Sequence, residues 1–375
     1  MNQLKRTFIK LCIVMITVCI SETGFSQNKT EYITVPNGSK ISTSILNTLI
    51  KKTMDSLQIP GISIAIVNDY KIAYHKTFGV KNIKTQDPVS SETIFEGASL
   101  SKPLFAYFVM KMVEEGEFDL DKPIFPYLEM AIGAEATKQA IDPNSLDDYK
   151  TLTPRTILSH GTGIPNWVKG KPIKIAFKPG TDFSYSGEAY QHLGAALGTK
   201  LGIGWGSALD TLFLKKAANP IGMDRSFYTW NDVLEKHVSR GHMDGKMNME
   251  IHRDKKVGPG YSLQSDAQDY ALFLIEIMNP KNIKESTRDE MLKEHNHFKP
   301  DSKLLKETGQ TGWGLGFAQK PTPYGLMHLH TGNNHDFQAY TMFIPDQKYG
   351  FVIFGNSNNL FPLLNRIEKL IGEHF

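Results

Sequence analysis

The chain has 375 residues, of which 40% are hydrophobic and 22% are charged, a balance that is typical of a globular protein with a large core. This composition excludes a disordered or fibrous chain and allows one large domain or two interleaved ones. The formal net charge is only +3. Because the sequence lacks the blocks of lysine and arginine that nucleic-acid-binding proteins carry, we expect no nucleic-acid partner.

The first 26 residues have the layout of a secretory signal peptide. Three basic residues precede an apolar run over residues 11–20, and the small residues Gly24 and Ser26 suit cleavage after Ser26. The run is too short to cross a membrane comfortably. We therefore expect an exported protein, periplasmic or extracellular, without a stable membrane span once this segment is removed. A lipid anchor on Cys19 is the less favoured alternative, because Val18 stands where a small residue is needed.

Both cysteines, Cys12 and Cys19, lie inside this segment. The mature chain would then contain none, which excludes disulfides, thiol chemistry and cysteine-ligated metal sites. Cleavage would also remove three basic residues and Glu22, which leaves a formal net charge of +1. We expect a nearly neutral mature protein.

After a polar lead-in over residues 27–40, the apolar pattern changes from helical to alternating. Apolar residues recur at helical spacing over residues 45–57 and stop before Pro60, which predicts an amphipathic helix. Residues 62–66 and 72–78 then read as two strands around a turn, which predicts a β-hairpin.

The middle of the chain, residues 99–291, has the pattern of helices joined by long loops. Ser265 and Gln268 are placed to form a capping box at the start of the last of these helices. The predicted helices cover residues 103–115, 153–158, 189–201, 208–218 and 265–278.

The C-terminal end mirrors the first hairpin. Strands over residues 340–344 and 351–354 flank a turn at Pro345-Asp346, and a helix follows over residues 363–371. The pattern predicts an α+β fold in which both chain ends build one antiparallel sheet with terminal helices on a face.

The expected organisation is therefore one globular region over residues 41–375. Its sheet part takes residues 41–98 and 292–375, and residues 99–291 form a mostly helical insertion.

Ser99 and Lys102 lie three residues apart where this helical part begins. If the helix includes Ser99 in its first turn, both side chains share one face. A serine hydroxyl is a poor nucleophile until a base takes its proton, and a helix N-terminus supplies unsatisfied N–H groups where negative charge develops. This S-x-x-K pattern is typical of acyl-transfer serine enzymes, although most lone pairs of this kind are a helix cap and a solvated lysine.

Two later segments could complete such a site. Tyr185 lies in a turn-rich loop before a helix, and its phenol, with an ordinary pKa of about 10, serves as a base only if a cation such as Lys102 stabilises the phenolate. Small residues around Gly332 open the penultimate strand and could bring backbone N–H groups to an oxyanion. The alternatives are an aromatic anchor for a loop and a polar strand entry.

Other residues of interest have plainer interpretations. The histidines at 295, 297, 328 and 330 lack a further ligand at the spacing of metallo-enzymes, so we expect no metal and no cofactor. His160 is expected to order a loop, and the tryptophans at 167, 230 and 313 could line a pocket or simply pack.

Together these motifs resemble the serine β-lactamase and penicillin-binding protein superfamily. Ser99-x-x-Lys102, Tyr185-Ser186 and His330-Thr331-Gly332 follow the order and approximate spacing of that superfamily. The most similar branch contains class C β-lactamases, D,D-peptidases, D-aminopeptidases and esterases, and the likeness covers roughly residues 40–375. Accessory stretches that resemble it are residues 60–63, 158–165, 178–185, 222–224 and 312–316.

The resemblance implies a role for each motif residue. Ser99 would be the acylated nucleophile, Lys102 and Tyr185 would share the proton handling, and His330 would take the place of the lysine or histidine that supports the tyrosine. Acyl-enzyme formation and hydrolysis would follow without a metal.

The resemblance also implies the binding groups. The backbone N–H groups of Ser99 and Asn333 would form the oxyanion hole, and Thr331, Gly332 and Gly187 would line the substrate site.

The chain departs from the resembled pattern in both later motifs. Tyr-x-Asn becomes Tyr-x-Gly at Gly187, so a side-chain amide worth roughly 1 to 3 kcal/mol to amide-type substrates is missing. His330 replaces a lysine and is mostly neutral at pH 7 with its ordinary pKa of about 6.5. We expect a secreted serine hydrolase of small-molecule or peptide esters or amides, with D-amino-acid peptides and β-lactams among the candidates. The alternative is a catalytically weak or silent binder of cell-wall peptides or penicillin.

Overall fold

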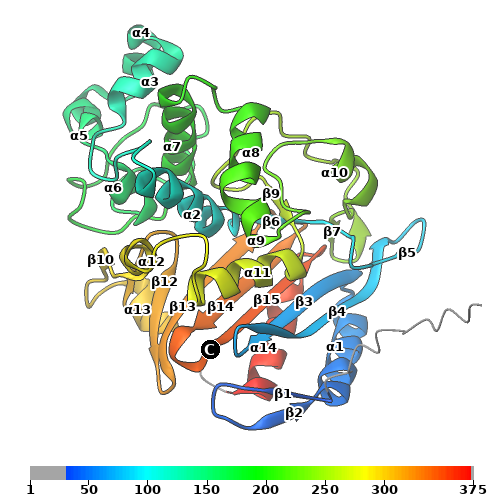
Figure 1. Cartoon of the computed structure of the whole chain (residues 1–375). Helices are drawn as coiled ribbons and strands as arrows, with labels where there is room; N and C mark the ends of the chain where they lie inside the picture. The colour runs from blue at the N-terminus through cyan, green and yellow to red at the C-terminus, as the bar shows by residue number, and fades with distance from the viewer. Residues whose placement is uncertain (1–30, 373–375) are drawn as a thin grey trace, which may run out of the picture.

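The computed structural model describes residues 31–372. The expected signal peptide, both cysteines and the alternative lipid anchor lie outside these residues. Within them, a nine-stranded antiparallel sheet forms the centre of the molecule (Figure 1). In spatial order its strands are β10 (Asn296–His297), β11 (Gly312–Trp313), β12 (Ala318–Thr322), β13 (Gly325–Asn333), β14 (Gln338–Ile344), β15 (Tyr349–Gly355), β3 (Gly61–Asn68), β4 (Lys71–Asn82) and β5 (Asp87–Pro88).

The two ends of the chain meet in this sheet. β15 pairs antiparallel with β3, and Ile353 lies opposite Ile64. The first hairpin turns at Asp69 and Tyr70, which both adopt the left-handed conformation that tight hairpin turns require. The prediction of one antiparallel sheet built from both chain ends is confirmed.

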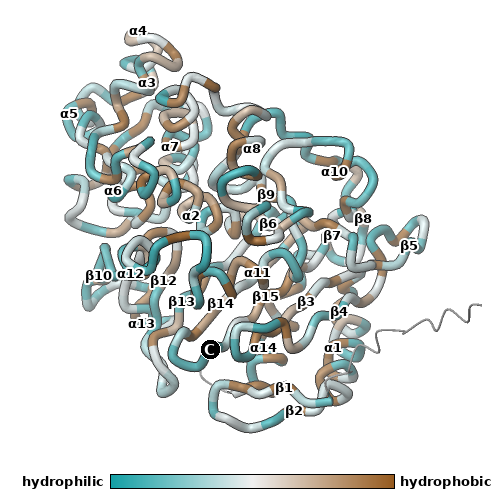
Figure 2. Tube along the Cα trace, in the orientation of Figure 1, coloured by the Kyte–Doolittle hydropathy of each residue, from teal (hydrophilic) through white to brown (hydrophobic). Residues whose placement is uncertain are grey.

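Strand β3 is buried on both faces, and its alternating residues serve two cores. Ile64 and Ile66 face the core beneath α1 (Thr43–Leu57) and α14 (Leu360–Ile371). Ala65 and Val67 face the core shared with α2 (Ser101–Glu114) and α11 (Ala267–Met278). This follows from the two-residue period of a strand, and Figure 2 shows hydrophobic segments along the central strands and α11.

The helical part forms the other half of the molecule (Figure 1). The predicted helices are present as α2, α6 (Pro154–Leu158), α7 (Gly187–Lys200), α8 (Ser207–Phe213) with a π-turn over Leu214–Ala218, and α11. Further helices are α3 (Phe125–Ile132), α4 (Ala134–Gln139), α5 (Leu146–Lys150), α9 (Asn219–Ile221), α10 (Asp232–His237), α12 (Glu285–Leu292) and α13 (Lys303–Thr308). These helices are short or weakly periodic, which explains why the apolar pattern did not reveal them.

Small two-stranded sheets lie outside the central one. They pair β1 (Tyr32–Thr34) with β2 (Lys40–Ser42), β6 (Phe95–Ala98) with β9 (Leu263–Ser265), and β7 (His242–Met243) with β8 (Lys246–Met247). Of these, β6 matters most, because it leads directly into α2. Among residues 31–372, none of the helices is long and apolar enough to cross a membrane.

The start of α11 differs from the predicted capping box. Ser265 ends β9, and Asp266 is the N-cap, with its Oδ1 accepting the backbone N–H groups of Gln268 and Asp269 at 2.8 and 3.0 Å. Asp266 Oδ2 also accepts a hydrogen bond from Arg225 Nε at 2.7 Å. Because β9 keeps Ser265 extended, the next residue caps the helix, and its carboxylate can hold Arg225 as well.

Candidate active site

A strand, a turn and a helix place the candidate nucleophile. β6 ends at Ala98, which has a left-handed φ of 47°, and α2 begins at Ser101, so its first turn does not include Ser99. Ser99 therefore occupies the turn just before the helix, and its carbonyl accepts the N–H of Lys102 at 3.0 Å. The half-buried Ser99 side chain stays accessible there.

Ser99 and Lys102 are in direct contact, as the pattern predicted. Lys102 Nζ lies 3.0 Å from Ser99 Oγ and donates to the carbonyl oxygen of Gly260 at 2.8 Å. Ser99 Oγ itself lies 3.5 Å from that carbonyl. Lys102 is completely buried, and burial lowers the pKa of its amine from 10.5 to about 7. At neutral pH a large fraction of Lys102 is therefore uncharged and able to accept a proton.

Tyr185 joins this pair from the loop before α7. Burial raises the pKa of the Tyr185 phenol well above its usual value of 10, and a hydrogen bond with Ser99 only partly offsets this. Lys102 Nζ lies over the Tyr185 ring, 4.7 Å from its centroid. Tyr185 is therefore a neutral phenol hydrogen-bonded to Ser99, not the phenolate that a cation would support.

His330 is neutral as well. It is buried on β13, and burial together with the charge of Lys102 lowers its pKa to about 3. Its Nδ1 lies 2.8 Å from the carbonyl oxygen of Thr331, so Nδ1 carries the proton because a carbonyl only accepts. The His330 ring centroid is 6.0 Å from that of Tyr185. The residue thus faces the tyrosine as an uncharged ring.

His160 packs against the same tyrosine from the loop after α6. The two ring centroids are 4.3 Å apart, and His160 Nδ1 accepts the backbone N–H of Ser186 at 3.1 Å. Trp313 packs on both, with ring centroids 5.0 Å from His160 and 5.8 Å from Tyr185. These contacts fit the loop-ordering role expected for His160. Trp313 belongs to the aromatic cluster that packs behind Tyr185.

The end of β13 lies beside the nucleophile turn. A Cβ on Gly332 would collide with the carbonyl oxygen of Gly97 and lie 3.3 Å from Ala98 Cβ. Only glycine permits this close approach of the strand to β6. Gly332 is thereby packed against residues 97, 98 and 100, which flank Ser99.

The register of β13 and β14 orients the backbone at this edge. Asn334 N–H donates to Phe337 O, so the neighbouring pair of Asn333 and Gln338 is a non-hydrogen-bonded pair of the ladder. Asn333 N–H consequently points away from β14. β12 pairs with β13 only up to Leu329, which leaves this edge open where an oxyanion hole would need a donor.

The Glu96 carboxylate holds the turn that follows Asn333. Glu96 Oε2 accepts from Asn334 Nδ2 at 2.8 Å, and Glu96 Oε1 lies 3.2 Å from His252 Nδ1. The Glu96 carboxylate raises the pKa of His252 to about 9. The carboxylate thus ties the β13–β14 turn to β6.

Gly187 begins α7, and the space beside it is filled by a neighbouring loop. Asn166 Oδ1 accepts the N–H of Gly187 at 2.8 Å, and a Cβ on Gly187 would lie 2.5 Å from a Trp167 ring atom. Of the other tryptophans, Trp230 lies instead under the guanidinium of Arg253.

The other histidines that were considered as metal ligands make contacts outside the Ser99 site. His295 Nε2 lies 2.8 Å from Glu290 O, His297 contacts Glu294, and His328 stacks on Phe343. Across the described residues, no group of three or more His, Cys, Asp or Glu side chains is arranged to hold a metal.

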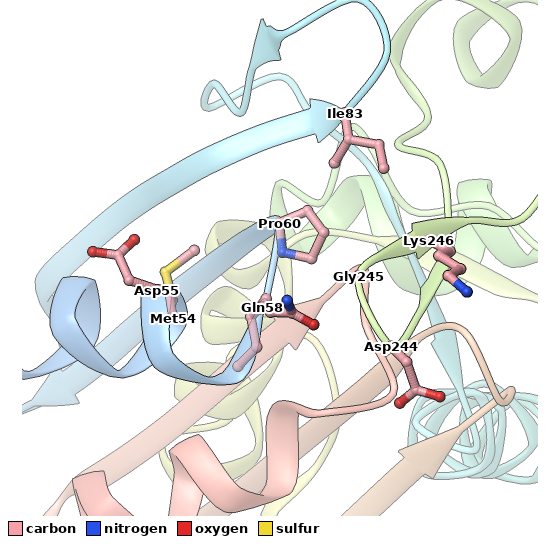
Figure 3. A pocket seen from close by; sticks show the side chains of 9 residues that line it. Met54, Asp55, Gln58, Pro60, Ile83, Asp244, Gly245 and Lys246 are labelled. Atoms are coloured by element: carbon pink, nitrogen blue, oxygen red, sulfur yellow. The ribbon is translucent and has the colours of Figure 1, made fainter.

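Sequence reasoning missed Gly260. Its carbonyl oxygen accepts from Lys102 Nζ, and a backbone acceptor leaves no signal in the residue type. A separate open pocket of about 520 Å³ lies at the end of α1 and the β7–β8 turn (Figure 3). None of its lining residues belongs to the candidate active site.

Comparison with known proteins identifies the family of this chain. The family model described as Beta-lactamase matches residues 46–373. A beta-lactamase from Providencia stuartii is 26% identical over 356 residues, which cover 85% of this chain and 87% of that protein. Protein flp from Staphylococcus aureus strain MRSA252 is 21% identical over 338 residues, which cover 84% of this chain and 63% of the relative.

Solved structures share the fold. D-alanine carboxypeptidase AmpC from Burkholderia cenocepacia has a TM-score of 0.70 and 20% identity, covering 88% of this chain and 99% of that one. The octameric penicillin-binding protein homologue from Pyrococcus abyssi also has a TM-score of 0.70, with 23% identity over 88% of this chain and 78% of that one. Because the family match spans most of the sequence, the chain belongs to the β-lactamase family of serine hydrolases.

Proposed function

We propose that this protein hydrolyses ester or amide bonds through an acyl-Ser99 intermediate. The observation that carries the proposal is the 3.0 Å contact between Ser99 Oγ and Lys102 Nζ, together with burial that lowers the Lys102 pKa to about 7. A serine beside a base whose pKa is close to 7 can be deprotonated and act as a nucleophile near neutral pH.

In the proposed acylation, neutral Lys102 takes the Ser99 proton while Oγ attacks the substrate carbonyl. The oxyanion forms between the backbone N–H groups of Ser99 and Asn333. Tyr185, as a neutral phenol bonded to Ser99, passes a proton to the leaving group and recovers one from the Lys102 ammonium. Water then attacks the acyl-enzyme, and the same groups transfer the protons in the reverse direction.

The neutral His330 and the missing side chain at Gly187 bear on which groups assist catalysis and which substrates are preferred. Since burial and Lys102 keep His330 neutral, we assign it packing against Tyr185 rather than charge support. Without an amide at 187, we expect p-nitrophenyl esters to turn over better than cephalosporins, and a steady-state comparison of both measures this. The opposite order would contradict the expectation. D-amino-acid peptides and β-lactams stay candidate substrates, because one relative is named a beta-lactamase and one similar structure a D-alanine carboxypeptidase.

A fluorophosphonate probe with intact-mass detection tests the acyl-serine step. We expect one adduct on the wild-type chain, no adduct on Ser99→Ala, and full labelling of Ser91→Ala, a matched control at an exposed serine. Equal labelling of Ser99→Ala would refute the assignment. An absence of labelling on wild type would favour the alternative of a catalytically silent cell-wall-peptide or penicillin-binding protein.

We also propose export to the periplasm or beyond the cell. The supporting observation is the signal-like layout of residues 1–26. Intact mass of the protein recovered from a periplasmic extract tests it, because cleavage after Ser26 predicts a chain that starts at Gln27. A full-length chain confined to the cytoplasm would contradict the proposal.

A further inference from the structure

The indole of Trp167 occupies the space into which a side chain at position 187 would project. A Cβ on Gly187 would lie 2.5 and 2.6 Å from Trp167 Cζ2 and Cη2, which is closer than a Cβ and a non-bonded ring carbon can approach. The hydrogen bond from Gly187 N–H to Asn166 Oδ1 holds this loop on the start of α7. A side chain at position 187 would therefore require the Trp167 ring to move from this position.

One residue separates this ring from the nucleophile. A Cβ on Gly260 would lie 3.4 Å from Trp167 Cη2 and 3.2 Å from Gly187 Cα, so the three residues are in contact. The carbonyl oxygen of Gly260 lies 3.5 Å from Ser99 Oγ. Trp167 is nevertheless 40% exposed. The indole is thus partly exposed, and Gly260 lies between it and the half-buried serine.

Tyr261 supplies a second aromatic wall. Its ring centroid lies 6.0 Å from that of Trp167, and the ring planes meet at 76°. The Tyr261 hydroxyl donates to Asp254 Oδ1 at 3.0 Å, and its backbone carbonyl accepts from Asn334 Nδ2 at 3.4 Å. These bonds hold the Tyr261 hydroxyl on Asp254 and the Tyr261 backbone on the turn after β13.

We propose that Trp167 and Tyr261 form an acyl-group subsite that takes a planar apolar group, such as an aryl ring, in place of the amide contact that position 187 lacks. The proposal rests on the acyl-Ser99 function and names its substrate class. Two aromatic walls meeting near a right angle can contact a planar group by its face and its edge, which are the favoured aromatic geometries. The acyl group would then be selected by apolar contact.

The test compares the kcat/KM for p-nitrophenyl phenylacetate with that for p-nitrophenyl acetate. The leaving group is the same, so the ratio reports the acyl subsite. We expect the ratio to fall at least about tenfold in Trp167→Ala and to be largely retained in Trp167→Phe. Trp230→Ala, a matched control, should keep the wild-type ratio. A ratio that is unchanged in Trp167→Ala would overturn the proposal.

A second pair of variants tests the shared space. The single variant Gly187→Asn should be less active than the wild type, because the new side chain meets the indole. The double variant Gly187→Asn with Trp167→Ala should be at least about tenfold more active than Gly187→Asn alone. Additive losses would count against mutual exclusion. Fluorophosphonate labelling measures competent Ser99 in every variant. Missing labelling on wild type defeats the acyl-serine function itself, whereas normal labelling with unchanged ratios defeats only the aromatic subsite.

Discussion

Replacing Lys102 with methionine should stabilise the folded chain at neutral pH and abolish acylation. The amine is fully buried, and its pKa falls from 10.5 to about 7. That difference corresponds to roughly 4 kcal/mol of unfolding free energy lost at pH 7. Methionine avoids this cost but leaves the Gly260 carbonyl without its donor, which costs about 1 to 3 kcal/mol. We expect a net gain of roughly 2 kcal/mol.

The pH dependence separates burial of the amine from mere packing. Between pH 7 and pH 10.5 the unfolded chain holds a proton on Lys102 that the folded chain has released. The free energy of unfolding of the wild type therefore rises with pH across this window, while below pH 7 the cost stays constant. Other titrating groups cancel in the difference from Lys102→Met. The advantage of the variant should shrink by about 3 kcal/mol between pH 7 and pH 10.

Urea unfolding followed by tryptophan fluorescence at pH 7, 8, 9 and 10 measures this difference. Lys303→Met is the matched control, because the Lys303 side chain is 81% exposed. Its stability should run parallel to that of the wild type at each pH. If the gap between wild type and Lys102→Met is constant in pH, then Lys102 keeps an ordinary pKa and cannot be the neutral base at pH 7.

Three further outcomes follow from the structure. Tyr185→Phe should lower the acylation rate by roughly two orders of magnitude, measured by burst kinetics, and an unchanged rate would remove Tyr185 from the proton path. The kcat/KM profile should rise with an apparent pKa near 7 as Lys102 loses its proton, and a profile flat from pH 6 to 8 would argue against it. Asp266→Ala should lower the free energy of unfolding, measured in urea, by about 2 kcal/mol or more, because α11 loses its cap and Arg225 its partner. A decrease of less than about 0.5 kcal/mol would refute this account.

The two chain ends show how much local pattern can predict. Ile62, Ile64 and Ile66 alternate with small residues, and the corresponding strand formed with the expected hairpin. The C-terminal strands and helix followed the same rules. These predictions succeeded because hydrophobic periodicity is a local property of long, regular elements.

The cap of α11 shows where local pattern fails. Ser265 and Gln268 satisfy the capping-box spacing, but pairing of β9 with β6 holds Ser265 in a strand. Asp266 then takes the cap position and the contact with Arg225. Strand pairing across more than 160 residues is a tertiary effect that no local window contains.

The sequence by itself determined the order of three motifs and, through the three-residue spacing, the meeting of Ser99 with Lys102. Only the tertiary structure decided how these groups are charged. Burial makes Lys102 a weaker base and His330 a neutral ring, because desolvation depends on what distant segments pack around a side chain. The same holds for Trp167, whose indole reaches Gly187 from another loop, a proximity set by the fold and not by spacing along the chain.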